Sequence, residues 1–313
     1  MNTNQQSTYF CISAIIASLF AATPAANAVT LIADYSNLGT VYQDTAGNLY
    51  DAPGAGRADV TSLFQSNVST AFTYLQNTVL LPWDHTVSFL LFPLVGADGD
   101  SLINSFDVNG RSSASTIRIS TGFPEFIDPT PFDNSEFTLS YGTTPLGGGF
   151  VNNKRFGDAI SGSGAEDKDD FLTLVLHETI HSLGISDNSQ RFEDLVGPTG
   201  ATPRTLTVGS AVSGLPAAFN IPVLAGSGHF AGDPATNDIF GFTTVSTPGW
   251  SLGQRALPTG LDILALGQVN GATPSGLNLN DSALAVPEPS TALLGAMGVL
   301  GLLCRRKRNE RNA

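Results

Sequence analysis

Two histidines and a glutamate stand within five consecutive residues, His177-Glu178-Thr179-Ile180-His181. Residues four apart on an α-helix lie on the same face, so the two imidazoles project side by side. Two imidazoles one turn apart can bind a single Zn²⁺ at about 2.0–2.1 Å. Glu178 projects beside them, where it can take a proton from a water held by the metal. The spacing predicts a zinc site with His177 and His181 as ligands and Glu178 as the catalytic base.

A catalytic zinc site of this kind needs a third protein ligand, and two residues are candidates. Asp187 follows shortly after Gly184, which comes one turn after His181. His229 stands much further along the chain, in the glycine-rich run GSGHF. We favour His229, because a neutral imidazole completes a three-histidine catalytic site. Asp187 stays open as the alternative third ligand, although a turn or cap after the helix also explains it.

The pattern His177-Glu178-x-x-His181-x-x-Gly184 resembles the active-site helix of metzincin-type zinc metallopeptidases. In long-insert relatives, including leishmanolysin-like enzymes, the third histidine follows an insertion, as His229 does here. The resemblance spans about residues 169–270. It implies an α+β zincin fold, with a twisted mixed sheet over the active-site helix and an irregular C-terminal subdomain. It also implies a secreted zinc metalloendopeptidase that hydrolyses protein or peptide substrates.

The chain departs from the metzincin pattern in one respect. That family has a methionine turn below the metal, but the only two methionines here are Met1 and Met297, both near the ends. The segment 247–250, Thr-Pro-Gly-Trp, is a candidate for a tight turn in its place. Because methionine is not a metal ligand in that family, the departure bears on the family resemblance more than on zinc.

Several elements must position this site. A helix is expected to open at Asp169 or Asp170, either of which can cap its first amide groups, and to end at Gly184 in a left-handed conformation. Its apolar residues form one stripe that buries against a sheet: Leu172, Val175, Leu176, Ile180 and Leu183. Apolar periodicity predicts another helix over 59–79 and strands over 29–33, 86–92, 115–120 and 137–141. Residues 142–164, rich in Gly, Asn and Ser, are expected to form a loop. A helix over 259–267 begins with a capping box of Thr259 and Asp262.

The N-terminus has the features of an export signal. Residues 1–28 carry no charged side chain, contain an apolar run and end in Ala26-Asn27-Ala28. This pattern predicts a secretory signal peptide, although it lacks the usual basic residue near its start. We find no internal repeat and no clean linker after it, so residues 29–285 are expected to form one metallopeptidase-like domain.

Residues 286–313 contain Pro287-Glu288-Pro289, then a short apolar stretch and four consecutive basic residues that begin at Arg305. They resemble the PEP-CTERM sorting signal of Gram-negative bacteria, in which an exosortase recognises the motif and removes the tail. The resemblance implies transient anchoring in the inner membrane through a short transmembrane segment. The product is then expected at the cell surface, in the extracellular matrix or in the medium. Both cysteines, Cys11 and Cys304, lie in the removable ends, so no disulfide is expected in the mature protein.

The charge balance excludes one class of partner. With 14 Lys and Arg against 27 Asp and Glu, the formal net charge is −13, so no basic face for a nucleic acid can form. Asp98, Asp100 and Asp107 could bind Ca²⁺, but they lack EF-hand spacing and a solvated loop is favoured. Acidity and the sorting tail also suit a rival function, a non-catalytic matrix or adhesion protein that retains the protease fold.

Overall fold

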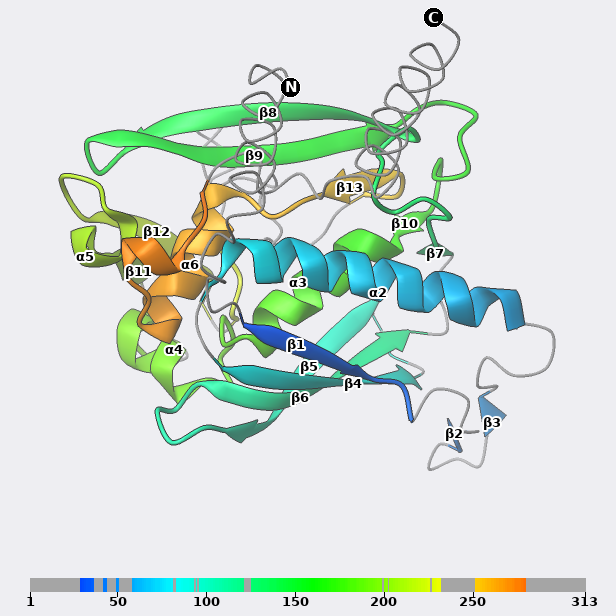
Figure 1. Cartoon of the computed structure of the whole chain (residues 1–313), viewed down its shortest axis with the longest axis horizontal. Coiled ribbons are helices and arrows are strands. Elements are labelled where there is room, and N and C mark those ends of the chain that lie inside the picture. Colours follow the sequence, from blue (N-terminus) through cyan, green and yellow to red (C-terminus); the bar gives the residue numbers. More distant parts are fainter. Residues whose placement is uncertain are drawn as a thin grey trace, which may run out of the picture.

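The structure is a computed structural model that describes residues 29–36, 42–43, 49–50, 58–80, 83–92, 94, 96–120, 125–198, 200–201, 203–225, 227–231 and 251–279. The expected signal peptide, sorting segment, both cysteines and the turn at 247–250 lie outside these residues. The described part is a mixed α+β fold of several sheets and few helices, which confirms the α+β class of the prediction (Figure 1).

The largest sheet has four strands in the order β1-β4-β6-β5. Three of them run parallel: β1 (Thr30–Asp34), β4 (Asp84–Phe92) and β6 (Ser112–Ser120). The fourth, β5 (Gly99–Phe106), pairs antiparallel with β6 at one edge, so the sheet is mixed, as expected. The strands predicted at 29–33, 86–92 and 115–120 are confirmed with shifted ends, whereas β5 was not predicted.

Two helices lie between this sheet and a long β-hairpin, as Figure 1 shows. They are α2 (Ala58–Thr78), which confirms the helix predicted over 59–79, and α3 (Phe171–Ser182). Phe64 of α2 links the layers, since its ring centroid lies 5.6 Å from that of Phe89 in β4 and 4.7 Å from that of Phe171 in α3. These aromatic contacts fix α3 against the sheet and α2.

The loop predicted over 142–164 is wrong for residues 142–159, and only 160–164 are free of helix and strand. The earlier residues extend β8 (Phe137–Leu146) and form β9 (Gly149–Ala159), which pair antiparallel. Gly147 and Gly148 connect the strands with φ values of +60° and +81°, and positive φ at both central residues is what a two-residue type I′ hairpin turn requires. The glycines that indicated a loop therefore make a tight turn. A short strand, β13 (Gln254–Ala256), adds to the outer edge of β9.

The C-terminal part consists of short elements. An antiparallel pair, β11 (Arg204–Val208) and β12 (Phe219–Val223), is accompanied by α4 (Gln190–Val196), α5 (Ser210–Ser213), α6 (Gly260–Asn270) and the 3₁₀ helix η1 (Pro274–Gly276). Elsewhere β2 (Tyr42–Gln43) pairs with β3 (Leu49–Tyr50), and β7 (Glu125–Phe126) with β10 (Asp169–Asp170). The capping box of Thr259 and Asp262 begins α6 as predicted. Within the described ranges, no helix combines the length and apolar character needed to cross a membrane.

Candidate metal centre

Helix α3 begins where the sequence predicted. Asp170 is its N-cap, and the Oδ2 atom of Asp170 accepts hydrogen bonds from the backbone N–H of Thr173 at 3.1 Å and from its hydroxyl at 2.6 Å. All residues of α3 are buried, so the helix is enclosed on every side, whereas the sequence predicted burial of one apolar stripe. After the helix, Gly184 adopts φ +111°, and its N–H donates to the carbonyl oxygen of His181. The helix therefore holds its histidines inside the protein core.

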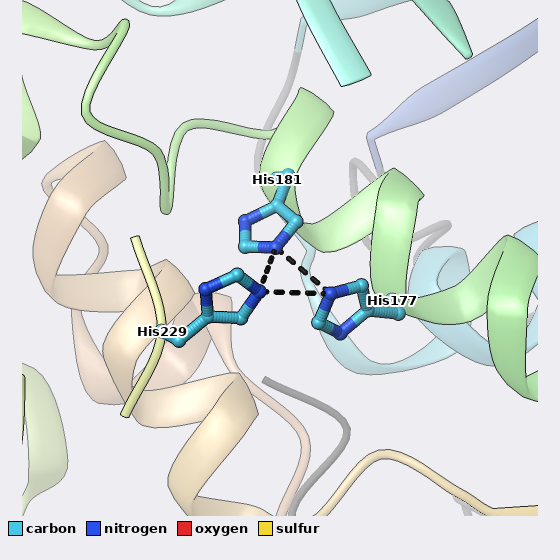
Figure 2. Close-up of side chains that lie close together, drawn as sticks. All are labelled: His177, His181 and His229. Atoms are coloured by element: carbon cyan, nitrogen blue, oxygen red, sulfur yellow. Dashed lines mark hydrogen bonds between the residues drawn. The ribbon is translucent and has the colours of Figure 1, made fainter. Parts of the chain in front are cut away.

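The structure brings His177, His181 and His229 together (Figure 2). The distances between their Nε2 atoms are 3.0 Å from His177 to His181, 3.1 Å from His177 to His229 and 3.1 Å from His181 to His229. His177 and His181 are buried and His229 is half-buried. Among the described residues, no other group of His, Cys, Asp and Glu side chains converges in this way.

Hydrogen bonds alone cannot satisfy this triangle of nitrogens. Each Nε2 atom carries either a hydrogen or a lone pair, so at least one of the three contacts joins two atoms of the same kind. A cation among the three lone pairs removes that conflict. Three nitrogens about 2.0–2.1 Å from one tetrahedral zinc ion lie about 3.3 Å apart. The observed separations are slightly shorter, and the donor set fits such an ion.

The environment holds His181 and His229 in the neutral form that a metal ligand needs. The Nδ1 atom of His181 lies 2.5 Å from the carbonyl oxygen of Ile185. Because a carbonyl can only accept, Nδ1 carries the hydrogen and Nε2 keeps its lone pair. Burial lowers the pKa of His181. Burial, and then the proximity of His181, lowers the pKa of His229 to about 3.

Glu178 lies beside the three histidines. Its side chain is buried, its Oε1 atom is 3.9 Å from the Nε2 atom of His177, and its Oε2 atom has no hydrogen-bond partner among the described residues. Burial, and then the charges of Asp100 and Asp98, together raise the pKa of Glu178 to about 8. At the start of β5, a Cβ at Gly99 would come within 3.3 Å of the Cγ atom of Glu178. The first residue of the edge strand therefore lies against the side chain of Glu178.

Asp187, the alternative third ligand, lies outside the group of three histidines. Its Oδ1 atom accepts hydrogen bonds from both terminal nitrogens of the Arg204 guanidinium, each at 3.0 Å. The carboxylate is thus engaged with a cation of the chain itself.

The three aspartates considered for calcium do not form a cation site either. Asp100 forms an ion pair with Arg118, and Asp107 forms one with Arg111 at 2.7 Å and closes a local turn. Burial raises the pKa of Asp98. Within the described ranges these carboxylates do not converge as the histidines do.

Sequence reasoning missed three residues that shape the site: Gly99, Arg204 and Gly228. Only Arg204 left a recognisable signal. It alternates with Leu206 and Val208 along β11, and all three are buried, so an arginine occupies the inward face of a strand. The two glycines matter because other parts of the chain approach them closely, and spacing along the sequence does not reveal such contacts.

Comparison with known families matches only the C-terminal end of the chain. Residues 285–308 match the PEP-CTERM protein-sorting motif. No curated protein matches the chain. The motif marks the protein as exported and sorted to the cell envelope, and it implies recognition by exosortase-type sorting machinery. It carries no information on the chemistry of the histidine site.

Proposed function

We propose that the protein is a secreted zinc-dependent endopeptidase. The observation that carries the proposal is the convergence of the three Nε2 atoms of His177, His181 and His229, with the Glu178 carboxyl group alongside. These three histidines would hold the ion. When bound, zinc supplies Lewis-acid polarisation of a carbonyl group and lowers the pKa of water toward about 7.

Glu178 is the proton carrier in this proposal. Without a nearby cation its pKa is about 8, chiefly because the carboxyl group is buried. A divalent cation held by the neighbouring imidazoles favours the charged carboxylate and lowers that pKa. The carboxylate can then accept a proton from the attacking water and pass it to the departing amine. The Oε2 atom of Glu178, which has no hydrogen-bond partner in the part of the chain that the structure describes, has a lone pair available for that transfer.

The edge strand β5 gives the proposal a place for an extended peptide. Its outer edge has no strand partner in the described part of the chain, and much of the strand is exposed. A peptide that adds to this edge forms backbone hydrogen bonds with β5. Because Gly99 brings β5 against Glu178, the bound backbone would run past the proposed catalytic base.

The metzincin resemblance, the Gram-negative origin and transient anchoring in the inner membrane belong to the same proposal. They are supported by the sequence pattern around α3 and by the short apolar stretch between the sorting motif and the basic C-terminal residues. After removal of the tail, the enzyme would act on proteins of the cell surface or the extracellular matrix.

The test combines metal analysis with proteolysis. The purified protein is expected to carry one zinc ion per chain and to cleave casein, and a chelator should abolish the cleavage. Glu178→Gln should keep the zinc and lose the activity by about 10³-fold or more. A wild-type protein without metal, or a Glu178→Gln variant as active as the wild type, contradicts the proposal. Bound zinc without cleavage of any protein favours the non-catalytic matrix protein, which the sorting motif also suits.

A further inference from the structure

Arg204 is a fully buried cation close to the proposed metal centre. Its Nη1 atom donates to the Oδ1 atom of Asp187 at 3.0 Å and to the carbonyl oxygens of Leu224 and Ser227 at 3.4 Å and 3.1 Å. Its Nη2 atom donates to Asp187 at 3.0 Å and to the Oε1 atom of Glu193 at 2.6 Å. One guanidinium group therefore joins the segment after α3, helix α4 and the turn that leads to His229.

Hydrogen bonds tie Leu224 and Ser227 to His229 across a turn whose described residues are 224–225 and 227–229. The N–H of Leu224 donates to the carbonyl oxygen of His229 at 2.9 Å, and the N–H of His229 donates to the hydroxyl of Ser227 at 3.3 Å. Beyond the turn, Phe230 bridges back to Val223 at the end of β12. Because Arg204 holds two carbonyl groups of this turn, it fixes the backbone from which the imidazole of His229 projects.

The segment Ile185–Ser186–Asp187 contacts both His181 on α3 and the Arg204 side chain that holds the turn with His229. Ile185 accepts the hydrogen bond from Nδ1 of His181, and Asp187 binds Arg204. The turn packs directly onto this segment, since a Cβ at Gly228 would come within 2.7 Å of the Cα atom of Ser186 and 2.8 Å of the carbonyl oxygen of Ile185. The backbone that orients one imidazole therefore also supports the turn that carries another.

We propose that Arg204 is a positioning residue that, through its ion pair with Asp187, holds His229 at metal-binding distance from His177 and His181. This inference rests on the metal centre of the proposed function. It gives Asp187 a role that differs from ligation, because Asp187 anchors the cation that holds the ligand-bearing turn. The planar fork of arginine serves several acceptors at fixed angles, which neither lysine nor an apolar side chain can do.

The test measures metal binding by Arg204→Met, with Arg191→Met as the matched control. Arg191 donates to the carbonyl oxygens of Val269 and Asn109, and within the described residues its hydrogen bonds do not reach the turn that carries His229. Zinc affinity is measured by competition with a chromophoric chelator, at a temperature where each variant is folded by circular dichroism. Loss of a residue that orients a ligand typically lowers metal affinity 10- to 100-fold, so we expect about that loss for Arg204→Met and less than about twofold for Arg191→Met.

Cobalt absorption separates positioning from a general loss of stability. Arg204→Met loaded with Co²⁺ should show the altered visible absorption of His229→Ala, and Arg204→Lys should lie between Arg204→Met and the wild type. If Arg204→Met does not fold, Asp187→Asn takes its place, with a zinc affinity at least about threefold below the wild type and the same direction of spectral change.

Wild-type affinity and spectrum in Arg204→Met, or in Asp187→Asn where that variant replaces it, overturn this inference alone. A wild-type protein that binds neither zinc nor cobalt overturns the metal centre and this inference together.

Discussion

Replacing Glu178 with Gln is expected to stabilise the metal-free protein at neutral pH, even though it removes the proposed catalytic base. The pKa of Glu178 rises from its usual 4.5 to about 8, first because of burial and then because of Asp100 and Asp98. Below pH 4.5 the carboxyl group is protonated in both the folded and the unfolded chain, so it adds no penalty. Between pH 4.5 and 8 the unfolded chain releases a proton that the folded chain keeps, and stability falls by about 1.4 kcal/mol per pH unit.

The expected size of the effect at pH 7 follows from that slope. The span from 4.5 to 7 corresponds to roughly 3 kcal/mol of lost stability in the wild type. Gln keeps the shape of the side chain without the charge, so the variant escapes this loss. Its amide adds an offset that does not change with pH, and for that reason the pH-dependent part of the difference is the diagnostic quantity.

The assay is urea unfolding of both chelator-treated proteins at a series of pH values from 4.5 to 9. The difference in unfolding free energy between Glu178→Gln and the wild type should grow steadily up to about pH 8 and then level off. Saturating zinc should reduce this growth, because a neighbouring cation favours the carboxylate. A difference that stays constant across the pH range would refute the reasoning, since it would mean that the buried carboxyl group is not penalised for its charge.

Three further predictions concern the neighbours of the site. His229→Ala should lower zinc affinity at least about 100-fold, whereas Asp187→Ala should lower it only about tenfold; equal zinc retention by the two variants, measured by competition titration, would contradict the roles given to them. Gly228→Ala should lower both the melting temperature and the zinc affinity, because its new Cβ would meet the backbone of Ser186 at 2.7 Å. Calorimetry with and without zinc measures both effects. An unchanged melting temperature would show that the turn can shift to accommodate the methyl group. Arg255→Met should lower the free energy of unfolding in urea by at least about 3 kcal/mol, because it leaves the buried carboxylates of Asp128 and Asp170 without their cation. A loss below about 1 kcal/mol would mean that water enters the space around these carboxylates.

Local signals made part of the structure predictable. The N-cap at Asp170, the histidine pair on α3 and the capping box at Thr259 depend on residues close together in the chain. Their geometry follows from the helix itself, and so the sequence was sufficient to place them.

Non-local contacts made the rest hard to predict. The strand β5 is exposed and mostly polar, and an edge strand of this kind lacks the apolar alternation that identifies a half-buried strand. The position of His229 depends on the pairing of β11 with β12, on Gly228 and on Arg204, and neither spacing nor composition encodes these contacts. The preference for a neutral imidazole favoured His229 as the third metal ligand, but only the folded chain brings it to His177 and His181.

The complete burial of α3 has a consequence for how an ion would come and go. Amide hydrogens of a helix enclosed on all sides exchange with deuterium only when the whole domain opens, so the imidazoles of His177 and His181 stay preorganised after an ion has left. His229, by contrast, is half-buried on a turn near the surface. Binding and release of a metal ion therefore depend on a rigid buried pair of histidines and on one ligand that is closer to the solvent. The rate at which the turn with His229 opens should set the rate at which a chelator removes the ion.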